Sequence, residues 1–348
     1  MKQRIYLDYN ATAPLRPEVR AAMVAAMDAV GNPSSVHQEG RAAKAIVEKA
    51  RRQVAQSFGA DGADIVFTSG ATEAAALALS QKGFVASDIE HDAVRQNAQC
   101  ALGVSAQGHV DVIEPEQTAL QYANSETGVV QSLPKGIAFC DATQGYGKLP
   151  IAFNWMGAQM AAISAHKIGG PAGIGALVMQ RGTDIAAQIK GGGQEGGRRS
   201  GTENIIGLAG FGAAAEAAQR DLNDGVWDRI KEFRIILENS LEQEVPEVIL
   251  VSKNVERLPN TVMCIVDGWR GETQVMQMDL AGFAISAGSA CSSGKVRQSN
   301  VLRAMGYSES QAACAIRVSL GPQTHRDEID RFVEAYAAAY RKQKSRSQ

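Results

Sequence analysis

Short β-rich runs alternate with alanine-rich stretches through the middle of this sequence, and that alternation restricts the possible folds. The clearest β-rich runs are Ile65–Thr68, Ile137–Cys140, Met160–Ile163 and Gly175–Met179. A helix is predicted from about Glu39 to Phe58, because apolar residues recur there at spacings of three and four. Strands that alternate with helices indicate an α/β domain built on a mostly parallel sheet.

The character of the sequence changes after about Leu222. A charged helix, Trp227–Glu244, is expected before strands near Thr261–Val266 and Phe283–Ser286. At 348 residues the chain is long enough for two domains. We therefore expect a large α/β domain over residues 14–222. The smaller α+β domain is expected to combine residues 1–13 with residues 223–348.

Composition and charge exclude several classes of protein. The net charge of −2 gives no reason to expect nucleic acid or a membrane surface as a partner. The N-terminus lacks the apolar region of a secretory signal, and no apolar run could span a bilayer, so we expect a cytoplasmic protein. Five widely spaced cysteines indicate free thiols, and five scattered histidines argue against a structural metal site.

Three polar signals stand at predicted strand ends, where open α/β sheets bind their ligands. The first is the turn Ser69–Ala71 with Thr72, which follows the strand Ile65–Thr68 and opens a helix. Free backbone N–H groups and the helix dipole favour an anion at such a turn. Most turns of this kind bind nothing, so this phosphate cradle is a weak signal by itself.

The second signal is Asp141, with Gln144, after the strand Ile137–Cys140. A carboxylate at the end of an apolar strand needs a cationic partner, and a protonated pyridine nitrogen would serve. Read alone, Asp141 is favoured as a helix N-cap by about two to one, because aspartate is a preferred capping residue.

The third signal is Lys167, which follows the strand Met160–Ile163 and precedes Gly169 and Gly170. Desolvation in a pocket would lower its pKa and free the amine to form a Schiff base. The alternative is a solvent-facing lysine, which describes nearly all lysines.

A phosphate turn, an aspartate and a lysine, each closing a different strand, form the set that a pyridoxal 5'-phosphate (PLP) site requires. The motifs are Asp141–Gln144, Ser164–Lys167, Arg199–Thr202 and Ser289–Cys291, with further matching stretches at Tyr6–Thr12, Gly31–Ser35 and Ile316–Gly321. Together they resemble the cysteine desulfurases of the class V aminotransferase family, which has the PLP-dependent type I fold. The resemblance covers nearly the whole chain.

The resemblance assigns cofactor roles to individual residues. It implies that Lys167 carries the cofactor, Asp141 pairs with the pyridine nitrogen, His91 stacks on the ring and moves protons, and Gln144 bonds the phenolic oxygen. The residues implied around the phosphate are Ala71, Thr72, Ser164 and His166. Thr202 matches a threonine that reaches the phosphate from the neighbouring subunit, which implies a homodimer. Read alone, His91 is more typical of a surface histidine.

The resemblance also assigns the substrate and sulfur chemistry. Arg317 matches the arginine that binds the substrate carboxylate, a role that suits its planar fork. Cys291 lies in a run of small polar residues, and a thiol there can accept the sulfur of L-cysteine as a persulfide. Its loop resembles that of the long-loop subgroup, which serves iron–sulfur cluster assembly. We expect the other four cysteines, at positions 100, 140, 264 and 314, to be buried.

The expected activity is conversion of L-cysteine to L-alanine, with the sulfur delivered from Cys291 to an acceptor such as an iron–sulfur scaffold. Two alternatives stay open. One is selenocysteine lyase or another class V activity, and the other is a degenerate, non-catalytic member that acts as a binding partner.

Two features depart from the family pattern. Ser125 replaces the second of two adjacent asparagines that relatives carry. Only residues 129–136 separate Gly128 from the strand at Ile137, although a parallel crossover needs about a dozen residues. We expect the large domain to lack at least one helix and to leave part of one sheet face uncovered, as a partner site or a source of instability.

Overall fold

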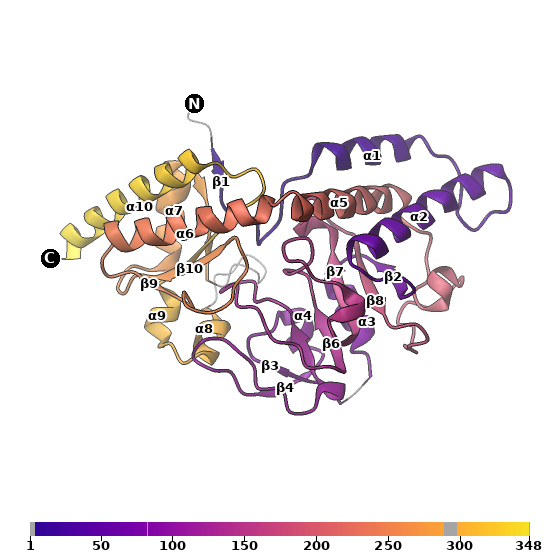
Figure 1. Cartoon of the computed structure of the whole chain (residues 1–348), viewed down its shortest axis with the longest axis horizontal. Coiled ribbons are helices and arrows are strands. Elements are labelled where there is room, and N and C mark those ends of the chain that lie inside the picture. The colour runs from indigo at the N-terminus through magenta and orange to yellow at the C-terminus, as the bar shows by residue number, and fades with distance from the viewer. Residues whose placement is uncertain (1–3, 82, 289–297, 348) are drawn as a thin grey trace.

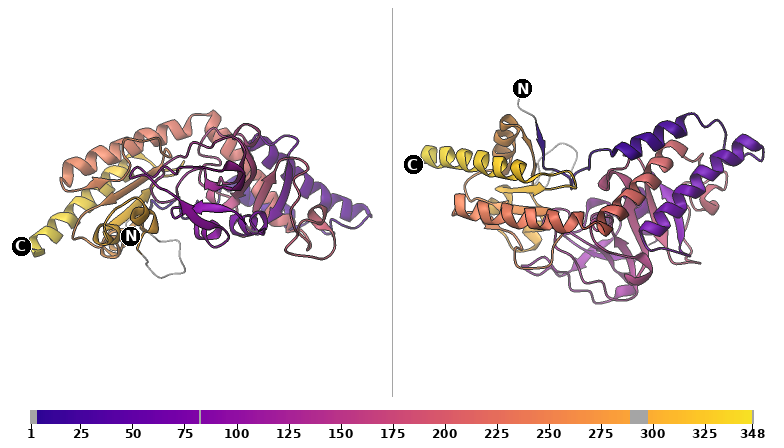
Figure 2. Two further views of the ribbon diagram at one scale, coloured as in Figure 1. Left: turned by 90° about the horizontal axis from the view of Figure 1, so that it is seen from below. Right: turned by 45° about the horizontal axis from the view of Figure 1, so that its top comes forward.

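The computed structural model describes residues 4–81, 83–288 and 298–347 (Figure 1). Two lobes lie side by side, and the C-terminal helix α10 (Arg326–Ser347) runs out along one end of the molecule (Figure 2). Within the described ranges, no helix combines the length and apolar character needed to cross a membrane.

The larger lobe is built around a sheet in the order β2 (Asp64–Thr68), β8 (Gly175–Met179), β7 (Ala158–Ser164), β6 (Ile137–Asp141) and β5 (Ala119–Gln121). Strands β5, β6 and β7 are parallel, whereas β8 pairs antiparallel with both β7 and β2. Only residues 165–174 join β7 to β8, too few for a parallel crossover, so β8 turns straight back. The predicted mostly parallel α/β fold is confirmed, with β8 as its antiparallel strand.

A further parallel pair extends the sheet beyond β5. It consists of β3 (Val85–Ser87) and β4 (Gln99–Leu102), and a bridge from Val85 to Thr118 joins it to the residue before β5. The short helix α4 (Asp92–Arg95) connects the two strands. β4 lies at the outer edge, where its side chains are largely exposed.

Helices cover both faces of the sheet. One face packs against α1 (Pro17–Met27), α2 (Gln38–Ser57) and α5 (Ile205–Asn223), and the other against α3 (Ala71–Ala78) and α4. The helix predicted from about Glu39 to Phe58 is α2, and its predicted apolar face is buried.

The smaller lobe has its own core. Its main sheet has the order β12 (Ser286–Ala287), β13 (Ala315–Ser319), β10 (Thr261–Ile265) and β9 (Ile249–Leu250). β1 (Ile5–Tyr6) pairs with β11 (Phe283–Ala284), so the N-terminal segment belongs to this lobe. The helices are α6 (Val226–Glu244), α7 (Gly271–Ala281), α8 (Asn300–Ala304), α9 (Glu309–Ala313) and α10. The predicted division at residue 222 stays a prediction.

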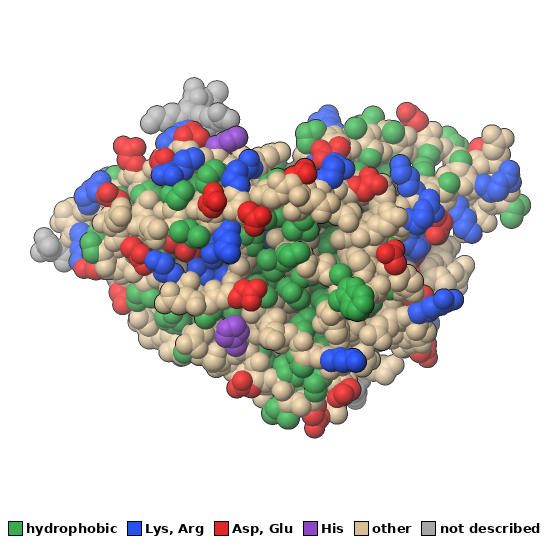
Figure 3. Space-filling model, in the orientation of Figure 1, with side chains coloured by type: hydrophobic (Ala, Val, Ile, Leu, Met, Phe, Trp, Pro, Cys, Tyr) green, Lys and Arg blue, Asp and Glu red, His purple; other side chains and the backbone are tan. Residues whose placement is uncertain are grey.

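The connection from β5 to β6, residues 122–136, contains no helix. The sheet face beneath it is nevertheless closed, because Leu120, Ile137 and Cys140 are 0% exposed. Apolar side chains from several loops pack over this face: Val110, Val112, Tyr122, Leu133, Ile151 and Met156. The expectation of an uncovered sheet face is therefore wrong. Some apolar side chains near these loops stay exposed, and Trp155 is 89% exposed. Figure 3 shows hydrophobic side chains along the middle of one face of the molecule.

This arrangement predicts opposite responses at two apolar residues. Leu120→Ala should lower the free energy of unfolding by about 2–5 kcal/mol, because it leaves a cavity in a closed core. Trp155→Ala should change it by no more than about 0.5 kcal/mol, since its side chain is already in water. Urea unfolding followed by circular dichroism measures both. A loss at Trp155 as large as that at Leu120 would show that Trp155 is part of the cover.

Candidate active site

Eight of the predicted site residues line one pocket at the carboxyl ends of β2, β6 and β7. The pocket has a volume of about 450 Å³. The predicted residues on its wall are Ala71, Thr72, His91, Asp141, Gln144, Ser164, His166 and Lys167. They come from four separate stretches of sequence, which the fold brings to one edge of the sheet, as expected for an open α/β sheet.

The anion-binding end of the pocket is the start of α3. No described side chain caps this N-terminus, so the first N–H groups of the helix are available to a ligand. Glu73 accepts a hydrogen bond from Ser69 N–H at 2.8 Å and pairs with Arg199 at 2.8 Å. Glu73 therefore fixes the turn through Ser69, and Arg199 balances its charge.

His166 is neutral on this wall. Burial, with smaller contributions from Lys167 and Lys148, lowers the pKa of His166 to about 4. Its Nδ1 lies 3.2 Å from the Thr12 hydroxyl. A neutral imidazole can still donate one N–H to an anion.

Lys167 follows β7 in the short turn Ala165–Lys167. Its Nζ donates to the carbonyl oxygens of Asn10 at 2.7 Å and Ala11 at 2.8 Å. Lys167 lines the pocket and is half-buried, so the alternative of a solvent-facing lysine does not describe it.

Asp141 and Gln144 also line the pocket. Asp141 Oδ1 accepts the N–H of Thr143 at 3.0 Å, but residues 142–152 contain no helix, so the helix-cap alternative is wrong. Gln144 is 5% exposed, and its Nε2 donates to Asn10 O at 3.0 Å. The Oε1 of Gln144 accepts from Lys148 Nζ at 2.7 Å, which fixes the orientation of the amide.

His91 is the N-cap of α4, and its side chain is exposed toward the pocket. Its Nδ1 accepts the N–H of Ala93 at 3.1 Å, so in the neutral ring the proton is on Nε2. Ser125 also lines the pocket, whereas Asn124 turns into the core and donates to Ile89 O at 3.0 Å. The departure at Ser125 therefore changes the pocket wall itself.

Sequence reasoning missed two polar residues of this pocket. Gln121 and Thr143 both line it, and neither Gln121 Nε2 nor Thr143 Oγ1 has a hydrogen-bond partner among the described residues. Gln121 closes β5 directly beside Asp141 of β6. The strand-end rule that identified Asp141 would have found it, but β5 has only three residues and no clear sequence pattern.

Three predicted residues are not brought to this pocket by the described structure. Arg317 lies on β13, is 1% exposed, and does not line the pocket. Its Nη2 donates to Asp8 Oδ1 at 2.7 Å and its Nη1 to Ser125 O at 3.0 Å. Thr202 is exposed. Cys291 lies outside the described residues, and these three roles stay predictions.

The four other cysteines do not all behave as expected. Cys140, Cys264 and Cys314 are buried, but Cys100 is exposed. The expectation for Cys100 is wrong because β4 is an edge strand whose side chains face solvent. Desolvation still raises the pKa of the Cys100 thiol, which disfavours the reactive thiolate.

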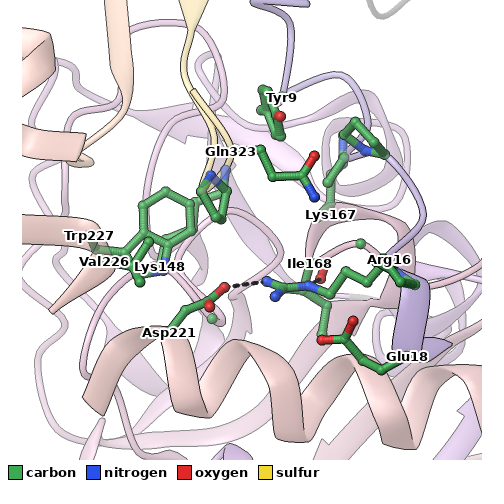
Figure 4. Close-up of a pocket in the computed structure, with 16 residues that line it drawn as sticks. Tyr9, Arg16, Glu18, Lys148, Lys167, Ile168, Asp221, Val226, Trp227 and Gln323 are labelled. Carbon is green, nitrogen blue, oxygen red and sulfur yellow. Dashed lines mark hydrogen bonds and ion pairs between the residues drawn. The ribbon is translucent and has the colours of Figure 1, made fainter. Parts of the chain in front are cut away.

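A second pocket, of about 250 Å³, borders Lys167 where the lobes meet. Figure 4 shows Arg16 and Asp221 paired across its floor, with Trp227, Lys148 and Gln323 around it. The ion pair measures 2.6 Å, and Arg16 Nε also donates to Ile168 O. This pair ties the N-terminal segment to α5 beneath the turn that carries Lys167.

Glu126 predicts a pH dependence of stability. Burial raises the pKa of Glu126 to about 7 from 4.5, and its carboxylate accepts a hydrogen bond from Ser299, the N-cap of α8. The stability that favours the neutral form is complete below about pH 4.5 and is lost as the pH rises through about 7.

Glu126→Gln, which stays neutral, should therefore raise the melting temperature at pH 8 and leave it nearly unchanged at pH 5. The exposed Glu114→Gln is the matched control. Equal effects of Glu126→Gln at the two pH values would contradict this assignment.

Comparisons with known proteins agree with this geometry. Residues 5–332 match the family described as "Aminotransferase class-V". A cysteine desulfurase of Sinorhizobium fredii is 38% identical, with 97% of each chain covered, and one of Enterobacter agglomerans is 38% identical over 95% of this chain and 91% of its own. The solved structure of a NifS-like protein from Rickettsia africae is 33% identical, has a TM-score of 0.89, and is matched over 97% of this chain and all of its own. The chain therefore belongs to the class V aminotransferase family, among the cysteine desulfurases.

Proposed function

We propose that this protein is a cysteine desulfurase, which converts L-cysteine to L-alanine and holds the sulfur on Cys291 as a persulfide. The single observation that carries the proposal is the pocket in which Thr72, Asp141 and Lys167 meet at three strand ends. A relative solved with cysteine bound, described as "SspA in complex with cysteine", supports L-cysteine as the substrate.

The pocket residues fit pyridoxal phosphate as the cofactor. The uncapped start of α3 suits the phosphate, and the unpartnered Gln121 Nε2 and Thr143 Oγ1 leave buried polar atoms for a ligand to satisfy. Asp141 suits a protonated ring nitrogen, and Lys167 supplies an amine to the same pocket. When bound, this cofactor supplies an electron sink for the carbon atoms of an amino acid.

The chain's own residues supply position and protons. The carbonyls of Asn10 and Ala11 hold Lys167 Nζ at the pocket wall. Lys148 fixes the Gln144 amide with its N–H toward Asn10. His91 presents the proton of its Nε2 at the pocket, which suits transfer of a proton to or from the substrate.

Arg317 is proposed as the partner of the substrate carboxylate. Its fork already pairs with Asp8 and bonds the carbonyl of Ser125, a residue of the pocket wall. Asp8 offers the guanidinium only its Oδ1, because its Oδ2 accepts a hydrogen bond from Ser286, whereas an incoming carboxylate could offer both oxygens. We propose that it displaces Asp8 from the guanidinium.

Further parts of the proposal concern the assembly and its surroundings. A homodimer in which Thr202 reaches the partner's cofactor phosphate is proposed from the family resemblance, as is a sulfur acceptor such as an iron–sulfur scaffold. A cytoplasmic location is proposed from the sequence pattern of the N-terminus. Selenocysteine lyase is the alternative activity, because Ser125 alters the pocket wall. A non-catalytic member is disfavoured by the eight predicted residues that line the pocket.

Cys291→Ala tests the sulfur-transfer step. The variant should bind pyridoxal phosphate and L-cysteine as the wild type does, while alanine formation from cysteine falls by orders of magnitude, because the attacking thiolate is lost. Cys100→Ala, which removes the exposed thiol outside the pocket, is the matched control and should keep full activity.

Mass spectrometry of wild-type protein after a cysteine pulse should place the persulfide on Cys291. If Cys291→Ala releases sulfide at the wild-type rate, with no persulfide on any cysteine, the mechanism is ruled out. Selenide release that survives in Cys291→Ala while sulfur transfer is lost would favour the lyase alternative.

A further inference from the structure

A third concave site lies along α6, the helix labelled in Figure 1. This groove has a volume of about 550 Å³. Its walls come from α6, from the end of α5, from the loop 148–152 and from the loop 255–259. The proposed sulfur chemistry uses none of these α6 or 255–259 residues.

Unsatisfied hydrogen-bond donors are concentrated in this groove. Arg234 Nε and Nη1, Arg257 Nε and Trp227 Nε1 are buried and have no partner among the described residues. All three residues line the groove, and each is at most 8% exposed. All four of these atoms are N–H donors, so a ligand that satisfies them must carry hydrogen-bond acceptors.

The buried charges beside the groove are also unbalanced. Arg257 pairs with Glu238 at 2.7 Å, and both side chains are nearly inaccessible. Arg234 lies close to the same pair, but no hydrogen bond from its guanidinium is formed with a described residue. Burial, reinforced by the charge of Arg257, lowers the pKa of Arg234 below its ordinary value. Two guanidinium groups thus lie near one buried carboxylate, and only Arg257 is bonded to it.

The acidic side chains on the groove are less able to neutralise these cations. Asp228 and Glu256 line it but are exposed, where water and salt screen their charge. Lys231, also exposed, adds a further positive charge to the rim. A buried cation without a partner is strongly unfavourable, and a bound anion would relieve that.

We propose that this groove binds a tetrahedral oxyanion of the phosphate class, either free or as the end of a phosphomonoester. The four donor atoms come from two elements, α6 and the loop 255–259, and they outnumber the two oxygens of a carboxylate. A phosphate has several acceptor oxygens and two negative charges, which match donors from more than one direction.

Calorimetric titration of orthophosphate into protein reconstituted with pyridoxal phosphate and then freed of excess cofactor tests the site, because the active-site pocket is filled and no free phosphomonoester competes for the groove. The wild type should show saturable binding and a higher melting temperature than in chloride at equal ionic strength. Arg234→Met should weaken orthophosphate binding by at least about tenfold, as expected for loss of a charge-assisted contact. Arg229→Gln, an exposed arginine of α6 outside the groove, is the matched control and should bind as the wild type does.

Equal binding by the wild type and Arg234→Met, or no saturable binding by the wild type, would overturn the proposal. If Arg234→Met fails to fold, Trp227→Phe replaces it, since it removes only one donor and should weaken binding several-fold; unchanged binding by Trp227→Phe would then overturn the proposal. A parallel titration with glycerol phosphate separates the two sources. Tighter binding of glycerol phosphate would identify a phosphomonoester as the ligand of the groove. Tighter binding of orthophosphate would identify the free ion, and either result supports the site.

Discussion

The structure depends on one buried asparagine, Asn10, which joins the N-terminal segment to both lobes. Asn10 is 0% exposed, and its side chain and backbone are fully hydrogen-bonded. Its partners are Ser319, Ser125, Thr261, Lys148, Asn260, Gln144 and Lys167. A buried amide that lost one of these partners would keep the full desolvation penalty of that atom. Asn10 therefore holds the two lobes together, and its carbonyl oxygen positions both Lys167 and Gln144, which donate hydrogen bonds to it.

Lys148 extends this network and is a buried lysine beside the half-buried Lys167. Its Nζ donates to Asn10 Oδ1 at 2.9 Å and to Gln144 Oε1 at 2.7 Å. Burial, reinforced by the neighbouring charges of Lys167 and Arg317, lowers the pKa of Lys148 well below its ordinary value. A neutral amine can make both of these donations. Lys148 is thus a positioning residue that orients Gln144, whereas Lys167 is the lysine that lines the pocket.

Sequence reasoning found the parts of the site that follow from local patterns. Thr72, Asp141 and Lys167 each stand at the end of an apolar strand, and parallel strands bring such ends together. Asn10 and Lys148 carry no local signal, because their partners are up to 309 residues away along the chain. The same limit explains the errors. Cys100 has apolar neighbours but lies on an edge strand, and the sheet face beside the short crossover is covered by loop side chains rather than by a helix. Both outcomes depend on tertiary packing rather than on local composition.

The central claim is that the strand ends form a cofactor site in which Lys167, and not its neighbour Lys148, supplies the reactive amine. Borohydride reduction of the protein loaded with pyridoxal phosphate, followed by peptide mapping, tests this directly. We expect a pyridoxyl group on Lys167 alone, because Lys167 lines the pocket, whereas Lys148 is buried and does not line it. A pyridoxyl group on Lys148, or no labelled lysine in protein that retains the cofactor, would contradict it.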